Sequence, residues 1–387
     1  YNVRLYDCDV LQTPHFGIYA AGRDRTAEGY PDNYGVFQIE ACTVVVSSKN
    51  IVYTGTGATC TGRTNCYGIE IVRGGPDTYI KHGHITADEG NHGGRGVMLV
   101  GTNGTQANPL VLCSTYVSMH EACDYNYYQD SVYMPNALRI RQENIGVHVF
   151  DCEFHYTADG SVAYGTTSGS YYPSGHGIMI EDWDGSIPRY ITVENNLIRV
   201  RDKSKTGGAC ISGITFDNFL SGYDTTTHVR YNRIETDDMG FRFGGYDEQG
   251  RLVILEGDTL VMVDTSLNEN ESFHVGWRSM AYQCDSIFIR DFVYLDKNGN
   301  PQDYDTDILF QGGAENRDIR LQKTLTFLVT DGDDNPLNGA TITVTDNYGH
   351  LQLNTTTNGS GVANGVVTYA YYNDDFPDSA FAPFTIE

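Results

Sequence analysis

One strand-forming frame recurs along most of this chain and limits what it can fold into. In VHVFDCEF and ITVENNLI, two alternating apolar residues are followed three positions later by a small or polar residue, and two positions after that by another apolar residue. Alternation with period 2 predicts a half-buried strand, and the residue at the fixed offset predicts a bend. Copies run from Val3 to Tyr294 at the spacing of roughly 20 to 50 residues that is typical of repeat architectures.

A second short strand, usually opened by glycine, lies between successive copies, as in GRGVMLVG and GHGIMIED. Each coil of two strands is too thin to bury its own apolar face, so the coils must stack on one another. Turn-forming residues are abundant and helix signals are almost absent. The sequence therefore predicts an all-β chain whose residues 1–321 form a parallel β-helix of about nine to ten coils.

This repeat resembles that of the right-handed parallel β-helix family, which includes pectate lyases, polygalacturonases, phage tailspikes and many surface proteins. The resemblance covers the repeat alone, and it implies a right-handed coil of the pectate-lyase type. It does not imply one activity, because a single scaffold supports many functions.

Residues 322–387 differ in character and predict a second domain. The turn NPLNGA followed by TITVTD resembles the Ig-like or carboxypeptidase-regulatory-like modules that are appended to surface proteins. Alternating Thr/Val segments after the turn are typical of strands. The resemblance implies a small β-sandwich that serves as a spacer or an assembly contact. The last strand of this module is expected to be incomplete.

The charge and the ends of the chain bear on partners and on location. A net charge of −25 argues against binding of nucleic acid or of an anionic membrane through a basic patch. No apolar run of about 20 residues predicts membrane insertion. The chain begins without Met and stops within an apparent strand, so we expect a segment of a longer extracellular protein, either secreted or displayed on a cell surface.

Disulfides are common in secreted chains, and Cys60 and Cys66, which flank a short loop, could form one, whereas the repeat indicates another role for some of the nine cysteines. Several of them occupy the bend position of the repeat, where later coils carry asparagine, and stacking would place these small groups in one internal ladder. No Cys-x-x-Cys pair occurs, so neither zinc nor haem is expected. The predicted structural ladder consists of Cys8, Cys42, Cys152, Asn196 and Asn232.

Two tyrosine-rich insertions on neighbouring coils are the candidate ligand-binding surface. They connect the first strand of a coil to its second, so they are expected to lie side by side. Tyrosine suits contacts with sugar rings or with a partner protein, and the alternative is packing of loop on loop. The candidate residues are Tyr125, Tyr127, Tyr128, Tyr133, Tyr164, Tyr171 and Tyr172, with Trp183.

Gly175-His176-Gly177 resembles the Gly-His-Gly motif of polygalacturonases. That family also uses a trio of aspartates, and the preceding coils lack its adjacent Asp-Asp pair. The nearby acidic residues suit a glycosidase pair, a Ca²⁺ site or an ordinary solvated turn. If the chain is an enzyme, the catalytic candidates are Asp159, His176, Glu181, Asp182 and Asp184.

Metal sites are only weakly indicated. His82 and His84 are spaced as a metal pair on one strand, and the alternative is a surface-facing strand with a polar turn. The loop DKNGNPQDYDTD is either a Ca²⁺ loop or an ordinary turn, and it lacks the spacing of a full calcium motif. No cofactor is expected, and Ca²⁺ stays open.

Three functions from different classes fit these features. The favoured one is an extracellular structural or adhesive surface protein, a rigid rod in a filament or multi-domain assembly that contacts glycans or neighbouring subunits. The alternatives are a polysaccharide hydrolase or lyase and a phage tail-associated protein. The sequence does not assemble a catalytic site, so it leans away from an enzyme.

Overall fold

The structure is a computed structural model, and its described parts leave out several connecting segments. The described residues are 2–13, 16–22, 34–47, 52–55, 58–61, 67–88, 94–123, 135–141, 144–162, 174–181, 189–203, 210–217, 227–243, 253–264, 273–275, 284–302, 308–310, 317–373 and 376–387.

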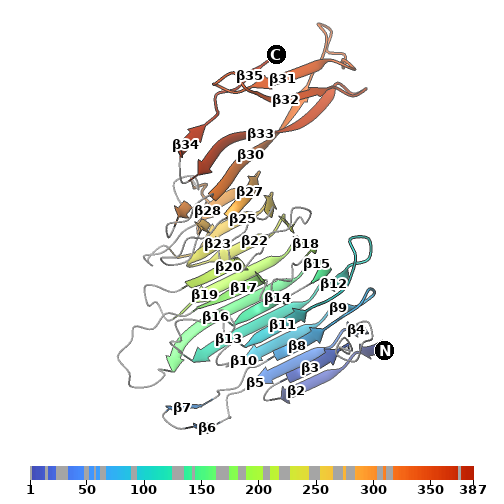
Figure 1. Cartoon of the computed structure of the whole chain (residues 1–387), viewed down its shortest axis with the longest axis vertical. Coiled ribbons are helices and arrows are strands. Elements are labelled where there is room, and N and C mark those ends of the chain that lie inside the picture. Colours follow the sequence, from blue (N-terminus) through green and yellow to red (C-terminus); the bar gives the residue numbers. More distant parts are fainter. Residues whose placement is uncertain are drawn as a thin grey trace, which may run out of the picture.

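The chain passes repeatedly through three long sheets, called here sheets A, B and C, and adds one strand to each in turn (Figure 1). Up to β30, every pairing in these sheets is parallel and joins strands of successive turns. Sheet A contains β1 (Asn2–Tyr6), β4 (Val36–Glu40), β9 (Tyr79–Lys81), β12 (Leu110–Cys113), β15 (Ile145–Phe150), β18 (Arg189–Glu194), β21 (Thr227–Arg230), β24 (Val253–Glu256), β27 (Cys284–Arg290), β30 (Arg317–Leu328), β33 (Val362–Asn373) and β34 (Phe376–Ala380).

Sheets B and C follow the same order. Sheet B contains β2 (Asp9–Thr13), β5 (Thr43–Ser47), β10 (His84–Asp88), β13 (Tyr116–Cys123), β16 (Glu153–Val162), β19 (Leu197–Asp202), β22 (Arg233–Thr236), β25 (Thr259–Met262) and β28 (Val293–Asp296). Sheet C contains β3 (Phe16–Ala21), β8 (Tyr67–Val72), β11 (Arg95–Val100), β14 (Asn136–Arg141), β17 (Ser174–Glu181), β20 (Cys210–Asp217), β23 (Met239–Phe243), β26 (Phe273–Val275) and β29 (Ile308–Phe310). The all-β class is confirmed, and the long parallel sheets fit a solenoid of the parallel β-helix kind.

The structure differs from the sequence prediction in the number of strands per coil. The recurring frame is two strands from two sheets, not one bent strand, so each coil has three strands. A residue of left-handed conformation separates the strands of sheets A and B, with φ between 48° and 64° throughout. Apolar alternation continues on both sides of the bend, so the pattern reads as one strand. The bend residues are Asp7, Ala41, His82, Ser114, Asp151, Asn195, Tyr231, Gly257 and Asp291.

Where the residue after the bend is Asn196, Asn232 or Asp258, its side chain lies in the interior and forms a hydrogen-bonded ladder. Asn196 Oδ1 accepts a bond from the backbone N–H of Cys152 (2.9 Å), and Asn232 Oδ1 accepts one from the N–H of Asn196 (3.0 Å). Asp258 Oδ1 accepts the next, from the N–H of Asn232 (2.8 Å). Each of these side chains is buried, so the ladder satisfies backbone donors that the bend removes from the sheets.

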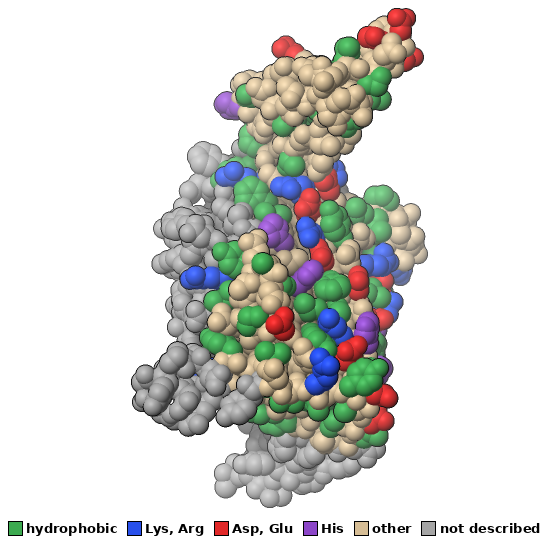
Figure 2. Space-filling model, turned by 90° about the vertical axis from the view of Figure 1, so that its right-hand side faces the viewer, with side chains coloured by type: hydrophobic (Ala, Val, Ile, Leu, Met, Phe, Trp, Pro, Cys, Tyr) green, Lys and Arg blue, Asp and Glu red, His purple; other side chains and the backbone are tan. Residues whose placement is uncertain are grey.

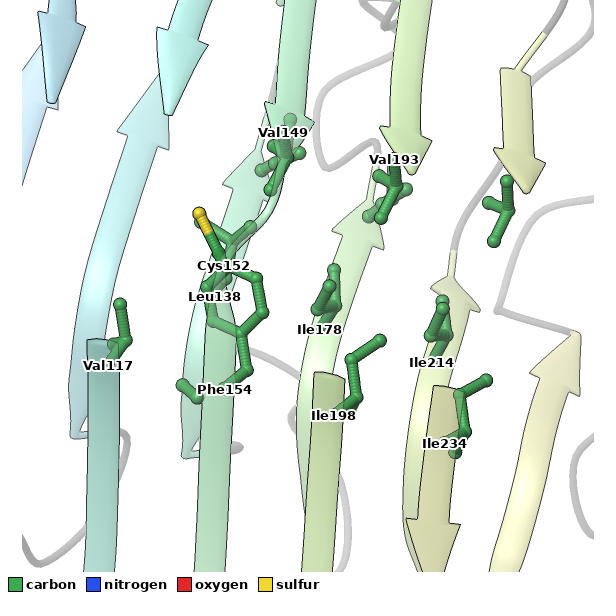
Figure 3. Packing of buried hydrophobic residues seen from close by; sticks show 14 of the residues in the cluster. Val117, Leu138, Val149, Cys152, Phe154, Ile178, Val193, Ile198, Ile214 and Ile234 are labelled. Atoms are coloured by element: carbon green, nitrogen blue, oxygen red, sulfur yellow. The ribbon is translucent and has the colours of Figure 1, made fainter. Parts of the chain in front are cut away.

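Apolar side chains fill the space between the three sheets. Figure 3 shows Ile178 of β17 beside Ile214 of β20, and Ile198 of β19 beside Ile234 of β22. All four side chains are fully buried. Because the strands are in register, like residues of successive turns stack at the strand spacing of about 4.8 Å. One continuous apolar core therefore runs from Ile18 to Leu321.

Sheet A continues past the solenoid into the C-terminal part of the chain. Strand β30 pairs in parallel with β27 and antiparallel with β33. A second sheet contains β31 (Thr341–Thr345), β32 (Leu351–Thr356) and β35 (Thr385–Ile386), and a small apolar cluster joins Ile342 and Val344 of β31 to Val367 of β33. The predicted domain boundary after residue 321 falls inside β30. A separate hairpin is formed by β6 (Val52–Gly55) and β7 (Ala58–Thr61).

The ladder generates a prediction at Asp258, where the asparagine series ends in a carboxyl group. Burial raises the pKa of Asp258 to about 7, and among the described residues Oδ2 has no hydrogen-bond partner. A carboxyl group whose pKa is raised by folding stabilises the folded state at pH values below its unfolded pKa, near 3.8. This stabilisation is lost as the pH rises from there to the folded pKa of about 7. Asp258→Asn should therefore gain up to about 4 kcal/mol over the wild type at pH 8.

The measurement is urea unfolding of both proteins from pH 4 to pH 8. The gain should shrink towards pH 4, and the same exchange at the exposed turn residue Asp334 should change stability by no more than about 0.5 kcal/mol. A gain from Asp258→Asn that is independent of pH would contradict the assignment.

Candidate functional site

The outer face of sheet C carries the largest set of buried polar side chains among the described residues. Two columns run across β11, β14, β17, β20 and β23 because the strands pair in register. We call these residues the sheet C cluster. They are Arg95, Asn136, His176 and Ser212 in one column, Arg139, Thr215 and Arg242 in the next, and Arg141 and Glu181 at the strand ends.

The local sequence explains why these side chains point outward. In each strand the residue of the first column is followed by a small residue, Gly or Ala. This small residue faces the crowded interior. A Cβ atom on Gly177 would lie 2.5 Å from Ile198 Cγ2, and one on Gly213 would lie 2.4 Å from Ile234 Cγ2. Leu138 and Ile140 belong to the core, so Arg139 between them faces the other side of the sheet.

Glu181 is the acidic centre of the cluster. Its Oε1 atom accepts a hydrogen bond from Arg139 Nε (2.6 Å) and also contacts Arg139 Nη2. Arg141 Nε lies 3.1 Å from the same oxygen. The side chains of Glu181 and Arg139 are fully buried. Paired, buried charges of this kind are costly to separate, because breaking the pair leaves one charge uncompensated in a dry environment.

His176 is the second centre. Its Nδ1 atom lies 2.8 Å from Ser212 Oγ and 2.9 Å from Thr215 Oγ1, and the two hydroxyl oxygens are 2.5 Å apart. Burial lowers the pKa of His176 well below 6.5, and the nearby positive charges of Arg242 and Arg139 lower it further. The imidazole is therefore neutral at physiological pH, and Nδ1 can accept a hydroxyl hydrogen.

The cluster is dense in positive charge. Burial and, to a smaller extent, the neighbouring charge of Arg139 lower the pKa of Arg95 to about 9, although Tyr67 and Glu181 act in the opposite direction. Arg95 Nη1 donates a hydrogen bond to the hydroxyl of Tyr67 (3.1 Å), and its guanidinium carbon lies 5.3 Å from that ring centroid. These two contacts hold the side chains of Arg95 and Tyr67 in place on the outer face of sheet C.

Burial decides what these residues can do. Glu181, Arg139, His176 and Ser212 each have no exposed surface. A group that acts on a substrate must come within hydrogen-bond distance of it. In this conformation these four side chains are enclosed by other protein atoms.

The structure places two of the predicted catalytic residues on one strand, His176 and Glu181 of β17. Asp159 lies in β16, but its side chain is outside the described residues. Asp182, Trp183 and Asp184 also fall outside them. The predicted acidic pair is thus described only at Glu181.

The tyrosine-rich insertions also fall outside the described residues, although their flanking strands do not. The candidates there are Tyr125, Tyr127, Tyr128, Tyr133, Tyr164, Tyr171 and Tyr172. The first insertion joins β13 to β14 and the second joins β16 to β17. Strand β13 pairs with β16 and β14 with β17, so the insertions begin and end on neighbouring strands.

The two candidate metal ligands do not share a strand as predicted, because His82 is a bend residue. His82 is exposed in the bend between β9 and β10, and His84 opens β10 and stacks on Tyr116 with ring centroids 4.6 Å apart. No group of three or more metal-ligating side chains occurs in the described part of the chain. The turn at Asp296 uses both carboxylate oxygens internally, because Asn298 N, Asn300 N and Asn300 Nδ2 donate to them.

Sequence reasoning missed Arg95, Arg242, Ser212 and Thr215. A sequence signal for Arg95 and Ser212 was present, since each directly precedes a glycine within a strand of sheet C, as His176 does. Aligning the strands on that glycine would have placed these residues in one column. Nothing local marks Arg242 or Thr215, whose neighbours become visible only from the register.

Comparison of the chain with protein-family models, with curated proteins and with solved structures finds no match. Within the described ranges, no helix is both long enough and apolar enough to cross a membrane. The function is therefore argued from geometry.

The ion pair generates a prediction at Glu181. Glu181→Gln leaves Arg139 buried without its carboxylate and should destabilise the fold by about 3–5 kcal/mol. Glu153→Gln is the matched control, because Glu153 pairs with Arg199 and His155 while its side chain is 38% exposed, and it should cost no more than about 1 kcal/mol. Equal losses in urea unfolding would show that burial adds nothing to the Glu181 pair.

Proposed function

We propose that the chain is a rigid element of an extracellular surface assembly with a structural or adhesive role. In this proposal residues 1–321 form a right-handed parallel β-helix of nine to ten coils of the pectate-lyase type. Residues 322–387 form an Ig-like sandwich module, and the tyrosine-rich insertions contact glycans or neighbouring subunits.

The observation that carries the proposal is the continuity of β30. Its first residues, up to Gln322, pair with β27 of the solenoid, and the strand pairs with β33 from Ile319 to Leu328. Gln322 lies at the junction, where its amide donates to Thr368 Oγ1 (3.3 Å) and its Oε1 accepts from Arg290. A strand shared by two parts fixes their relative orientation, which a rod needs in order to present a module at a distance.

The outer face of sheet A also suits a soluble rod. Glu194, Arg230, Glu256 and Arg290 follow one another across four strands, so charge alternates in sign. Arg230 Nε lies 2.5 Å from Glu194 Oε2, and Arg290 Nη1 lies 3.5 Å from Glu256 Oε1. Figure 2 shows acidic, basic and histidine side chains interspersed on this side of the molecule. Alternating charges favour stacking in one register and keep apolar patches small.

A second candidate function is a polysaccharide hydrolase or lyase. The observation that favours it is the neutral His176 beside the Ser212 hydroxyl, a pairing of base and hydroxyl that enzymes use. Full burial of both residues counts against this candidate.

The function is tested by binding and turnover on one panel of neutral and acidic glycans. We expect binding to at least one glycan without release of reducing ends and without ultraviolet absorption from unsaturated products. Tyr127→Ser with Tyr128→Ser should abolish that binding. The control is Tyr6→Ser with Tyr231→Ser, because these side chains are 64% and 54% exposed elsewhere on the solenoid, and it should leave binding intact.

Turnover on any glycan would overturn the structural proposal in favour of the enzyme. Loss of turnover in His176→Asn would then assign the activity to the sheet C cluster. Binding that survives the change in the tyrosine insertions would remove them as the contact surface.

The shared strand generates a separate prediction on rigidity. Lys323→Pro removes a backbone N–H donor from the interior of β30. Proline at such a position should lower the free energy of unfolding by about 3 kcal/mol. Spin labels at exposed Tyr231 and Asn364 should give one narrow distance distribution in the wild type and a broad one in the variant. Lys323→Ala, which keeps the N–H group, should retain the narrow distribution. A broad distribution in the wild type would contradict a rigid rod.

A further inference from the structure

A cavity of about 250 Å³ lies where sheet A leaves the solenoid. Its lining comes from β30, β32 and β33 and from the residue that follows β34, and it consists of Arg320, Gln352, Thr368, Tyr371 and Phe381. Both sheets of the C-terminal part therefore contribute to it. In Figure 1 these strands meet directly above the stacked turns.

The register of sheet A positions the cationic wall. Phe288 of β27, Arg320 of β30 and Tyr371 of β33 are direct neighbours across three strands. The guanidinium carbon of Arg320 lies 5.4 Å from the Phe288 ring centroid and 5.7 Å from that of Tyr371. Arg320 is nevertheless solvent-exposed. Rings on two sides hold the planar cation in place, so less freedom is lost when it binds an anion.

The opposite wall is fixed by backbone bonds. The N–H group of Phe381 donates to the carbonyl oxygen of Tyr369 (2.8 Å), and its carbonyl oxygen accepts from the N–H group of Asn347 (3.1 Å). Tyr348 packs against Phe381 edge to face, with centroids 6.1 Å apart. The aromatic surface that Phe381 contributes is therefore formed before any ligand arrives.

Two polar groups complete the lining. Gln352 Nε2 donates to Asp346 Oδ2 (2.9 Å), and that bond fixes the orientation of the amide. Thr368 Oγ1 accepts a bond from Gln322 Nε2 (3.3 Å) and keeps its own hydroxyl hydrogen as a donor. The cavity thus combines a cation, two aromatic rings, an amide and a hydroxyl.

We propose that this junction cavity binds one sugar residue that carries a carboxylate. Arginine matches a carboxylate through two parallel N–H donors, and aromatic faces suit the apolar faces of a sugar ring. The amide and the hydroxyl suit ring hydroxyl groups. A volume of about 250 Å³ lies just below the roughly 300 Å³ at which drug-sized pockets begin, and it accommodates one sugar ring.

The inference goes beyond the proposed function, because it names a ligand class and a place that the tyrosine insertions do not share. The chain as a whole is strongly acidic, so an acidic ligand must be held by a local cation and not by general attraction. Arg320 supplies that local cation.

The test is isothermal titration calorimetry of the whole chain with methyl glucuronide and with methyl glucoside. These probes differ only in whether the ring carries a carboxylate. We expect the glucuronide to bind at least tenfold more tightly than the glucoside. Arg320→Gln should weaken glucuronide binding at least tenfold, and Arg320→Lys should also weaken it, because lysine keeps the charge and loses the paired donors.

Lys323→Gln is the matched control, because it removes the same charge from the same strand outside the cavity lining. It should change affinity less than twofold. Phe381→Leu gives a second variant on the opposite wall, and it should weaken binding while Tm stays near the wild-type value.

The proposal is overturned if the wild type binds both probes equally or neither of them. It is also overturned if Lys323→Gln loses as much affinity as Arg320→Gln, since general electrostatic attraction would then account for binding. Stronger binding of acetate or of a peptide with a free C-terminus would equally refute a sugar site. Loss through Arg320 with intact tyrosine-dependent binding separates this site from the proposed function.

Discussion

The bend between sheets A and B is the constraint on which the remaining structure depends. At each bend from Asp7 to Asp291 one residue takes a left-handed conformation. In the later turns the next residue, as at Asn196 and Asn232, accepts a hydrogen bond from the backbone of the neighbouring turn, which helps to keep successive strands in register. A shift of one residue would turn core side chains outward, so the bends fix both the core and the outer faces.

The same register stacks outer side chains in columns and brings like charges together. On sheet A the problem is resolved by alternation, as in Glu194, Arg230 and Glu256. On sheet C several arginines approach one another, and the carboxylate of Glu181 binds two of them. Breaking the buried Arg139–Glu181 ion pair costs more free energy than breaking an exposed pair, because little water screens the buried charges. The cluster is accordingly a structural centre of the outer face.

The junction shows how one strand can join two arrangements. Strand β30 accepts a parallel neighbour on one side and an antiparallel neighbour on the other. The second sheet of the C-terminal part then lies across the extended end of sheet A, and the crossing leaves a cavity with Arg320 in its wall. Rigidity of the rod and the existence of the cavity follow from the same pairing.

The sequence by itself determined the all-β class, the stacking of turns and the bend positions, because apolar period and bend residues are local properties. Cys152, Asn196 and Asn232 were predicted to share one internal position on that basis, and in the structure each is the buried residue directly after the bend of its turn. Only the tertiary structure decided that each bend separates two sheets, since alternation reads identically on both sides. It alone brought Arg139 to Glu181, and Arg320 to Tyr371, because pairing between strands that are dozens of residues apart leaves no mark in either strand.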